Sequence, residues 1–417
     1  MKTTFIIICV IAFLSCSNIY IASPKSQQHV NTKNIKQTIY IAGDFGSPSS
    51  SLKDITTAIA SDINQQKERP CILGLGDNLY VKGFPRSEVS NSKPFKKLLK
   101  IAKLFAKCRY KNNSVPLVTI PGNHDYNDDA IASERKWGNI APWYFLAQIS
   151  HPKDRHLFEN WLFLPGNAQN HKSHSELYRT LYSKPQNLVK YMKPTIIPQE
   201  IVHPSVDIIA IDSELAIDLF AYGYDKLARQ YLRSLIKVVP KNNNKWQVLL
   251  THHSLESYAK HRPGKLGSFI FGPGWPQFPQ WWHKLLLIPP FGTLATLGWW
   301  SIHYPQDIHS CAYDNYRQTL YSIIEETGID LVISGHEHCT QVIELQKTSL
   351  NTNNTSTKCV QLVCGESAKK DPVTSGSGTA FYHTGYGYSQ VMIHDQKLVI
   401  EVKDRYGNHL YQHVINK

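Results

Sequence analysis

The sequence lacks three features that each indicate a particular class of protein. It contains no Cys-x-x-Cys pair, which argues against a structural zinc site of the finger type. It contains no internal repeat and no long low-complexity tract. Its N-terminal apolar run, residues 5–14, is too short for the ~20 residues of a membrane-spanning helix. The 42% of apolar and 11% of aromatic residues that are present exclude a disordered or fibrous chain.

Charged residues are also sparse, at 18% of the chain against a globular norm of about 25%. Acidic residues are the scarcer kind: 45 Lys and Arg against 32 Asp and Glu give a formal net charge of +13 at pH 7. The 19 His add positive charge below about pH 6.5. This balance favours anionic partners such as nucleic acid, anionic lipid or phosphate-bearing small molecules, and a solvated basic face is the alternative. The 417 residues suit one large domain or two ordinary ones.

The N-terminus has the layout of a signal peptide, in which a short apolar run is followed by small residues. Cleavage after Ser17 or Ala22 fits this layout, and we expect residues 1–23 to be removed. The protein is then exported, which means secreted or, in a bacterial host, periplasmic. Lipidation of Cys16 is the alternative.

Six cysteines follow the signal segment, and an exported chain permits disulfides among them in fifteen complete connectivities. They are Cys71, Cys108, Cys311, Cys339, Cys359 and Cys364. The last two are close together on strand-like runs and are the first pair that we expect. Three asparagines begin glycosylation sequons, which matter only in a host that glycosylates: Asn112, Asn353 and Asn354.

Short apolar runs that end in loops of Gly, Asp, Asn or His predict buried strands bounded by turns. These runs are residues 39–42, 71–75, 118–120, 206–211, 248–250 and 331–333. Apolar residues at three/four spacing predict helices between them, at 52–65, 95–106, 226–236 and 313–327. Alternation of strands and helices predicts an α/β core, in which sites form at the carboxyl ends of the strands. The C-terminal runs 361–363, 390–393, 398–402 and 410–414 predict a second sheet packed on the first.

Two segments, at about 131–204 and 255–312, fit this alternation poorly, and we interpret them as inserts. The second contains a Trp-rich stretch, residues 268–302, whose last part is apolar and uncharged. A Pro pair at 289–290 breaks a helix there, so we predict an ordered lid or wall over the site rather than a membrane span. Peripheral membrane contact through the aromatic stretch is the alternative.

Side chains with metal-binding chemistry recur at the ends of the predicted strands. They are Asp44, Asp77, Tyr80, Asn123, His252, His336 and His338. Carboxylate, phenolate, amide and imidazole donors suit first-row transition metals, and no thiolate is present to favour a softer ion. Seven ligands are too many for one metal and fit two, with one carboxylate bridging, as in two-metal hydrolytic sites. Any one of them alone could be a turn or core residue, but seven in order at strand ends predict a site.

The motifs around these residues resemble those of the calcineurin-like metallophosphoesterases. They are Gly-Asp-x-Gly at 43–46, Gly-Asp-x-x-Tyr at 76–80, Gly-Asn-His-Asp at 122–125, a strand-end His at 252 and Gly-His-x-His at 335–338. More narrowly, they resemble the purple acid phosphatases of the small tartrate-resistant type. Gly46 stands where the wider family has a metal-binding His, and Tyr80 replaces the lost ligand, as in the purple enzymes.

The resemblance implies a single metallophosphoesterase domain over residues 36–417. Its fold would be an α/β/β/α sandwich, two packed mixed β-sheets flanked by helices. The centre would contain Fe(III) held by Asp44, Tyr80 and His338, a divalent Fe, Zn or Mn ion held by Asn123, His252 and His336, and Asp77 as the bridge. Segments 365–367, 385–388 and 404–411 resemble the closing strands of the family.

The resemblance also implies the catalytic residues. His124 would contact phosphate and protonate the leaving alkoxide, and Asp125 would orient it, as a carboxylate commonly does for an imidazole. Family spacing favours His252 over its neighbour as the ligand, so we assign His253 a supporting or substrate-facing role.

The implied function is that of an acid phosphatase, which hydrolyses phosphomonoesters by attack of a metal-bound hydroxide. One alternative is a phosphodiesterase acting on nucleotides, nucleic acid or phospholipid headgroups, and another is a membrane- or partner-docking protein with a retained structural metal site. His124 argues against the docking protein, because a purely structural site needs no acid. A site among metals rather than in a basic groove suggests that the positive charge attracts phosphate-ester substrates. No nucleic acid is expected as a structural partner, and the sequence leaves the physiological substrate and the oligomeric state open.

Overall fold

The computed structural model describes residues 34–80, 83, 92–126, 156–165, 185–239, 244–259, 308, 310–345 and 359–417. All of these residues belong to one compact unit. The predicted signal peptide, the Trp-rich stretch 268–302 and most of both predicted inserts lie outside the described residues. Within the described part of the chain, no helix has the length and apolar character needed to cross a membrane.

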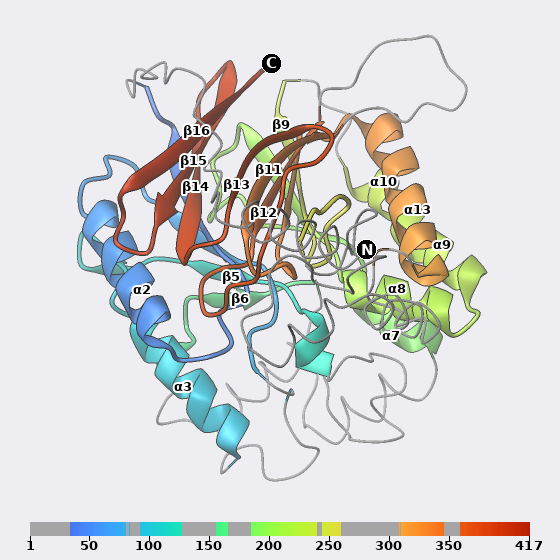
Figure 1. Ribbon diagram of the computed structural model, residues 1–417, viewed down its shortest axis with the longest axis horizontal. Helices are drawn as coiled ribbons and strands as arrows, with labels where there is room; N and C mark the ends of the chain where they lie inside the picture. Colours follow the sequence, from blue (N-terminus) through green and yellow to red (C-terminus); the bar gives the residue numbers. More distant parts are fainter. Residues whose placement is uncertain are drawn as a thin grey trace, which may run out of the picture. The chain divides into compact units, whose positions relative to one another are not determined.

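Two mixed sheets of seven strands each form the centre of this unit (Figure 1). The first has the order β16-β15-β14-β1-β2-β5-β6, with β1 Gln37–Ala42, β2 Cys71–Gly74, β5 Leu117–Thr119, β6 Trp161–Phe163, β14 Gly387–Ile393, β15 Lys397–Asp404 and β16 His409–Asn416. The second has the order β13-β11-β12-β10-β9-β8-β7, with β7 Thr195–Ile196, β8 Val206–Ala210, β9 Trp246–Leu250, β10 Leu331–Ser334, β11 Thr340–Leu345, β12 Cys359–Cys364 and β13 Thr379–His383. Strands β3 Arg109–Tyr110 and β4 Asn113–Ser114 form a separate hairpin.

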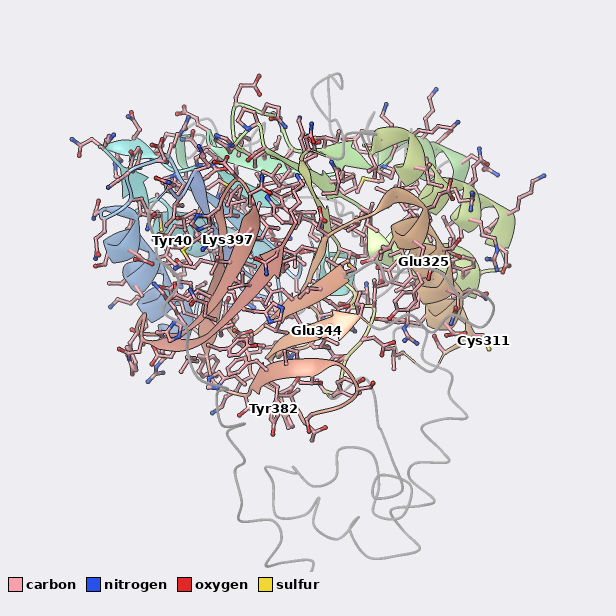
Figure 2. The ribbon with its side chains drawn as sticks, turned by 90° about the horizontal axis from the view of Figure 1, so that it is seen from above. Tyr40, Cys311, Glu325, Glu344, Tyr382 and Lys397 are labelled. Carbon is pink, nitrogen blue, oxygen red and sulfur yellow. The ribbon has the colours of Figure 1, made fainter. Side chains whose placement is uncertain are left out.

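Each sheet has a parallel block, β1-β2-β5-β6 in the first and β8-β9-β10-β12 in the second, and antiparallel strands outside it. In the view of Figure 2, Tyr40 and Lys397 mark the first sheet, and Glu344 and Tyr382 mark the second. Because parallel strands of one sheet end at the same edge, the loops after them converge there.

Helices cover the outer faces of the two sheets (Figure 1). Beside the first sheet lie α2 Ser50–Ile63 and α3 Lys93–Phe105, and beside the second lie α7 Pro185–Tyr191, α8 Ser213–Ala221, α9 Asp225–Arg233, α10 Leu235–Val238 and α13 Cys311–Thr327. Serine side chains at Ser49 and Ser310 accept hydrogen bonds from the first turns of α2 and α13, and this capping fixes where those helices begin.

Alternating residues of β1 explain how the layers pack. Tyr40 and Ala42 join the apolar cluster that contains the helix residues, whereas Ile39 and Ile41 join the cluster between the sheets. This two-residue period is that of a strand buried on both faces. The predicted fold, two packed mixed sheets flanked by helices, is thereby confirmed.

The predicted strands and helices are present, with small shifts at their ends. The prediction that the four C-terminal runs form a second sheet of their own is wrong: β14, β15 and β16 extend the first sheet beside β1, whereas β12 pairs with β10 in the second. The predicted helix at 226–236 is two helices, α9 and α10, which meet at Ser234. Within the predicted insert 131–204, residues 161–163 and 195–196 instead add edge strands β6 and β7 to the two sheets. Strands of three and two residues are too short for a period to be visible in the sequence.

The predicted Cys359–Cys364 disulfide is wrong. These residues are the two ends of β12, and a strand rises about 3.3 Å per residue, so their Cα atoms are about 16 Å apart. A disulfide requires Cα atoms within about 7 Å. All six cysteines among the described residues are free thiols, and only Cys311 is exposed.

Candidate metal centre

The loops that follow five strands bring the predicted ligands together. Asp44 follows β1, Asp77 and Tyr80 follow β2, Asn123 follows β5, His252 follows β9, and His336 and His338 follow β10. All seven are buried, although they are polar. A buried polar cluster is costly unless its members bind one another or an ion, so this cluster is a candidate functional site.

Backbone strain accompanies this convergence. Asp44, Asp77 and His336 have φ values of 54°, 49° and 69°, in the left-handed region that side chains rarely adopt. Such residues cost about 1–3 kcal/mol each and are concentrated at functional sites. The glycines beside them allow close approach: a Cβ on Gly122 would lie 2.4 Å from Asp77 Oδ1, and one on Gly365 would lie 2.5 Å from Asp44 Oδ2.

Asp44, Tyr80 and His338 form the first trio of donors. The Tyr80 hydroxyl lies 3.1 Å from Asp44 Oδ1 and 3.1 Å from His338 Nε2. His338 Nε2 lies 3.8 Å from Asp44 Oδ1. The three donor atoms therefore face one point, as the predicted ligand set for the first metal requires.

Asn123, His252 and His336 form the second trio. Asn123 Oδ1 lies 3.0 Å from His252 Nε2 and 3.3 Å from His336 Nδ1. These are the donors that the sequence predicts for the second metal.

Asp77 lies between the two trios. Its Oδ1 is 3.5 Å from His252 Nε2 of the second trio. On the other side, burial raises the pKa of Tyr80 most, and the charges of Asp44 and Asp77 raise it further. Ligand atoms of Asp44, Asp77 and His252 all lie within 4.8 Å of one another. This is the position that a bridging carboxylate would occupy.

The titration behaviour of these groups fits a cation-binding site. Burial and the charge of Asp77 raise the pKa of Asp44 well above its usual range. Burial alone would raise the pKa of Asp77, but the charges of His124 and His252 hold it well below its usual range. Burial and the two carboxylates raise the pKa of the Tyr80 phenol. Asp77 is therefore held in its ionised form, whereas the Asp44 carboxyl and the Tyr80 phenol resist ionisation and are the donors that metal ions would ionise.

Further contacts fix the orientation of two histidines. Asp371 Oδ2 lies 2.6 Å from His338 Nδ1, and the Leu75 carbonyl oxygen lies 2.7 Å from His252 Nδ1. In both rings the other nitrogen, Nε2, faces the donor trios, which is the arrangement of a metal-binding imidazole. Burial lowers the pKa of His338, partly opposed by Asp371, and this shift favours the neutral ring, which is the form that binds a metal. Sequence reasoning missed Asp371, because it lies seven residues beyond its strand.

His124 and Asp125 follow Asn123 in the short 3-10 helix Asn123–Tyr126. The His124 backbone N–H donates to Asp77 Oδ1 at 3.0 Å, and its Nε2 lies 3.9 Å from Asp77 Oδ2. Its side chain is 22% exposed, unlike the buried ligands. His124 therefore lies at the entrance of the site, where a substrate could reach it.

Asp125 is fully buried and connects the loops of the centre. Its Oδ2 accepts hydrogen bonds from the backbone N–H groups of Gly122 and Asn78 at 2.9 and 3.2 Å, and its Oδ1 accepts one from Leu79 at 3.2 Å. Burial, with the charge of Asp77, raises its pKa to about 8. These contacts give Asp125 a structural role, and its predicted action on His124 stays a prediction.

The ring of His253 packs against the rings of His252 and His336 in the second trio. Its Nδ1 is 2.9 Å from the Ser213 hydroxyl, and its Nε2 is 3.5 Å from Glu214 Oε2. One ring nitrogen from each of His252, His253 and His336 lies within 4.8 Å of the others, so these three residues could hold an ion. His253 also contacts α8 through Ser213 and Glu214, and its predicted supporting or substrate-facing role stays a prediction.

Comparisons with known proteins concern the fold and the family of the chain. A solved structure described as GAP50, the anchor in the inner membrane complex of Plasmodium, aligns with a TM-score of 0.52 and 13% identity over 91% of this chain and 88% of its own. A purple acid phosphatase from yellow lupin seeds aligns with a TM-score of 0.48 and 13% identity, over 91% of this chain and 53% of its own. PhoD aligns with a TM-score of 0.49 and 10% identity, over 94% of this chain and 70% of its own. At such identities the likeness concerns the fold alone. No curated protein matches the chain significantly. The sequence model of the calcineurin-like phosphoesterases matches residues 37–340, nearly three-quarters of the chain, and the protein therefore belongs to this family.

Proposed function

We propose that the protein is an acid phosphatase that hydrolyses phosphomonoesters at a dinuclear metal centre. The observation that carries this proposal is the arrangement of seven buried donors as two trios with Asp77 between them. A phosphoesterase is already implied by the family. The acid phosphatase is the finer proposal.

In this proposal the first trio would hold Fe(III), the second would hold divalent Fe, Zn or Mn, and Asp77 would be the shared carboxylate. A two-metal centre supplies Lewis-acid activation of water and of the phosphoryl group. The chain fixes the orientation of two of these ligands. Asp371 and the Leu75 carbonyl keep the ring protons of His338 and His252 on Nδ1, so the lone pair on Nε2 of each ring can bind a metal. Tyr80 favours a ferric ion, because a phenolate is a hard oxygen ligand.

His124 is the proton donor of the reaction in this proposal. Its ring meets the Tyr80 ring edge-on at 4.8 Å between centroids, and its backbone N–H is bound to Asp77. Both contacts hold the imidazole beside the centre. In its protonated form, which acidic solution favours, an imidazole at this place could protonate a leaving alkoxide, and we therefore expect an acidic optimum.

Metal analysis with a visible spectrum tests the ligand assignment. We expect iron together with a second metal, and a purple or pink colour from Fe(III) bound to the Tyr80 phenolate. A colourless, metal-loaded protein with undiminished activity would remove the ferric assignment and leave a metallophosphoesterase of another type.

A comparison of matched monoester and diester substrates tests the reaction. We expect aryl phosphate to be hydrolysed near pH 5 with a higher kcat/KM than the corresponding diester. A diester preference would establish the phosphodiesterase instead. Stoichiometric metal binding with no hydrolysis of either substrate would establish a docking protein.

We also propose that the protein is exported, and peripheral membrane contact through residues 268–302 is the alternative to a lid or wall over the site. The short N-terminal apolar run supports export, and the clustered tryptophans support the contact. N-terminal sequencing of the mature protein tests the first: a chain that begins at Met1 would refute it. Liposome co-sedimentation with and without residues 268–302 tests the second, and equal binding of both chains would refute it.

A further inference from the structure

Two consecutive lysines lie beside the Tyr80 side of the centre, in the loop between β12 and β13. The Lys369 ammonium is 3.2 Å from the centroid of the Tyr80 ring, and the Lys370 ammonium is 5.5 Å from that of Tyr386. Lys369 is half-buried and Lys370 is exposed. Because His124 meets the same Tyr80 ring, Lys369 and the proposed proton donor contact one aromatic side chain.

A third lysine, Lys97, donates a hydrogen bond from Nζ to the Tyr80 carbonyl oxygen at 2.6 Å. Two lysine ammonium groups, those of Lys369 and Lys97, therefore contact Tyr80, while the Asp371 carboxylate is engaged with His338.

Near the second trio the structure has a carboxylate instead: Glu214 Oε2 lies 3.5 Å from His253 Nε2, and both residues are fully buried. A substrate with more than one negative group would place its additional charge toward the lysines beside Tyr80. Lysine is suited to that role, since its ammonium binds phosphate as a point charge and contact with an aromatic face stabilises the cation.

We propose that Lys369, assisted by Lys370, forms a subsite for a second phosphoryl group of the substrate. This inference rests on the proposed function, because the donor trios take the phosphoryl group that is cleaved. The second group is bound and not transferred. The preferred substrates are then phosphomonoesters with a second phosphate close to the first, such as vicinal bisphosphates.

The test uses two phosphonates that cannot be hydrolysed, so that binding is measured without turnover. Calorimetric titration of the metal-loaded protein should give methylenediphosphonate a Kd about 10- to 100-fold lower than methylphosphonate, as expected for a hydrogen-bonded charge. Lys369→Met should remove most of this ratio and leave methylphosphonate binding nearly unchanged. Lys369→Arg should keep the ratio, because the charge remains.

Lys226→Met is the matched control, since Lys226 is an exposed lysine on α9. It should leave both Kd values unchanged. Equal affinity of the wild-type protein for the two phosphonates would overturn the subsite. An equal loss of affinity for both phosphonates in Lys369→Met would also overturn it. If Lys369→Met does not fold, Lys369→Gln replaces it, with thermal unfolding as the check.

Hydrolysis separates this inference from the proposed function. The wild-type protein should hydrolyse 2,3-bisphosphoglycerate with a higher kcat/KM than 2-phosphoglycerate, and Lys369→Met should lose the difference. A protein that discriminates the phosphonates but hydrolyses no monoester would retain the subsite and refute the acid phosphatase. A protein that hydrolyses both glycerates equally and binds both phosphonates equally would retain the phosphatase and refute the subsite.

Discussion

Replacing Asp371 with asparagine should weaken metal binding while the protein remains folded. Asp371 Oδ2 lies 2.6 Å from His338 Nδ1, and His338 Nε2 lies 3.1 Å from the Tyr80 hydroxyl. The carboxylate keeps the proton on Nδ1 and increases the basicity of Nε2, the proposed metal donor. Its loss therefore acts on the metal through the imidazole ring.

The structure sets the size of this effect. Carboxylates that support a metal-binding histidine typically contribute 10- to 100-fold to metal affinity. Asp371 has 22% of its side chain exposed, so solvent screens part of its charge. Asparagine keeps an acceptor oxygen and loses only the charge, and we expect about a tenfold loss for Asp371→Asn. Asp371→Ala also removes the acceptor, and we expect about a 100-fold loss.

Competition with a chelator of known affinity measures this loss, with the visible spectrum as a second readout. Asp404→Asn is a suitable control, because Asp404 accepts hydrogen bonds within the exposed turn at 404–408. It should leave metal affinity unchanged. Metal binding by Asp371→Asn and Asp371→Ala that equals the wild type would refute the reasoning.

Three further changes have defined outcomes. Tyr80→Phe should abolish the visible band and lower iron content, and a retained band would exclude Tyr80 as the ligand. His124→Ala should lower kcat by about 10²- to 10⁴-fold, with a smaller loss for aryl esters whose leaving groups need no proton; an equal loss for all esters would argue against an acid role. Burial raises the pKa of Glu366 to about 7 from its usual 4.5, so the folded state favours its protonated form. This contribution to the free energy of unfolding, up to about 3 kcal/mol, is present below pH 4.5 and is lost as the pH rises toward 7. Glu366→Gln should reduce this pH dependence in denaturant titrations, and an unchanged slope would contradict the assignment.

The sequence predicts the strands, the helices and the cluster of polar strand-end residues because these depend on local rules, whereas the assignment of strands to the two sheets does not. Apolar runs with a turn at their carboxyl end identify the strands, and Asp44, Asp77 and His336 lie within three residues of those ends. The sheet then brings them together, so no long-range information is needed beyond the strand order.

The remaining features depend on distances that the sequence does not contain. Asp371 and Lys369 lie in a loop without a regular period, between β12 and β13, and only the fold places them beside His338 and Tyr80. Helix α8 is buried on nearly all sides, so it lacks the one-sided apolar stripe that predicts a surface helix. Cys359 and Cys364 are close in sequence, but an extended strand separates them.

The most direct test of the account is the hydrolysis of an aryl phosphate near pH 5 by the purified, metal-loaded protein and by Asp77→Asn. Asp77 lies between the two trios, and its replacement removes the charge that the proposed bridge requires. We expect turnover by the wild type and a loss of at least about 10³-fold in Asp77→Asn, more than 4 kcal/mol in the activation barrier. Equal hydrolysis by both proteins would contradict the proposed centre.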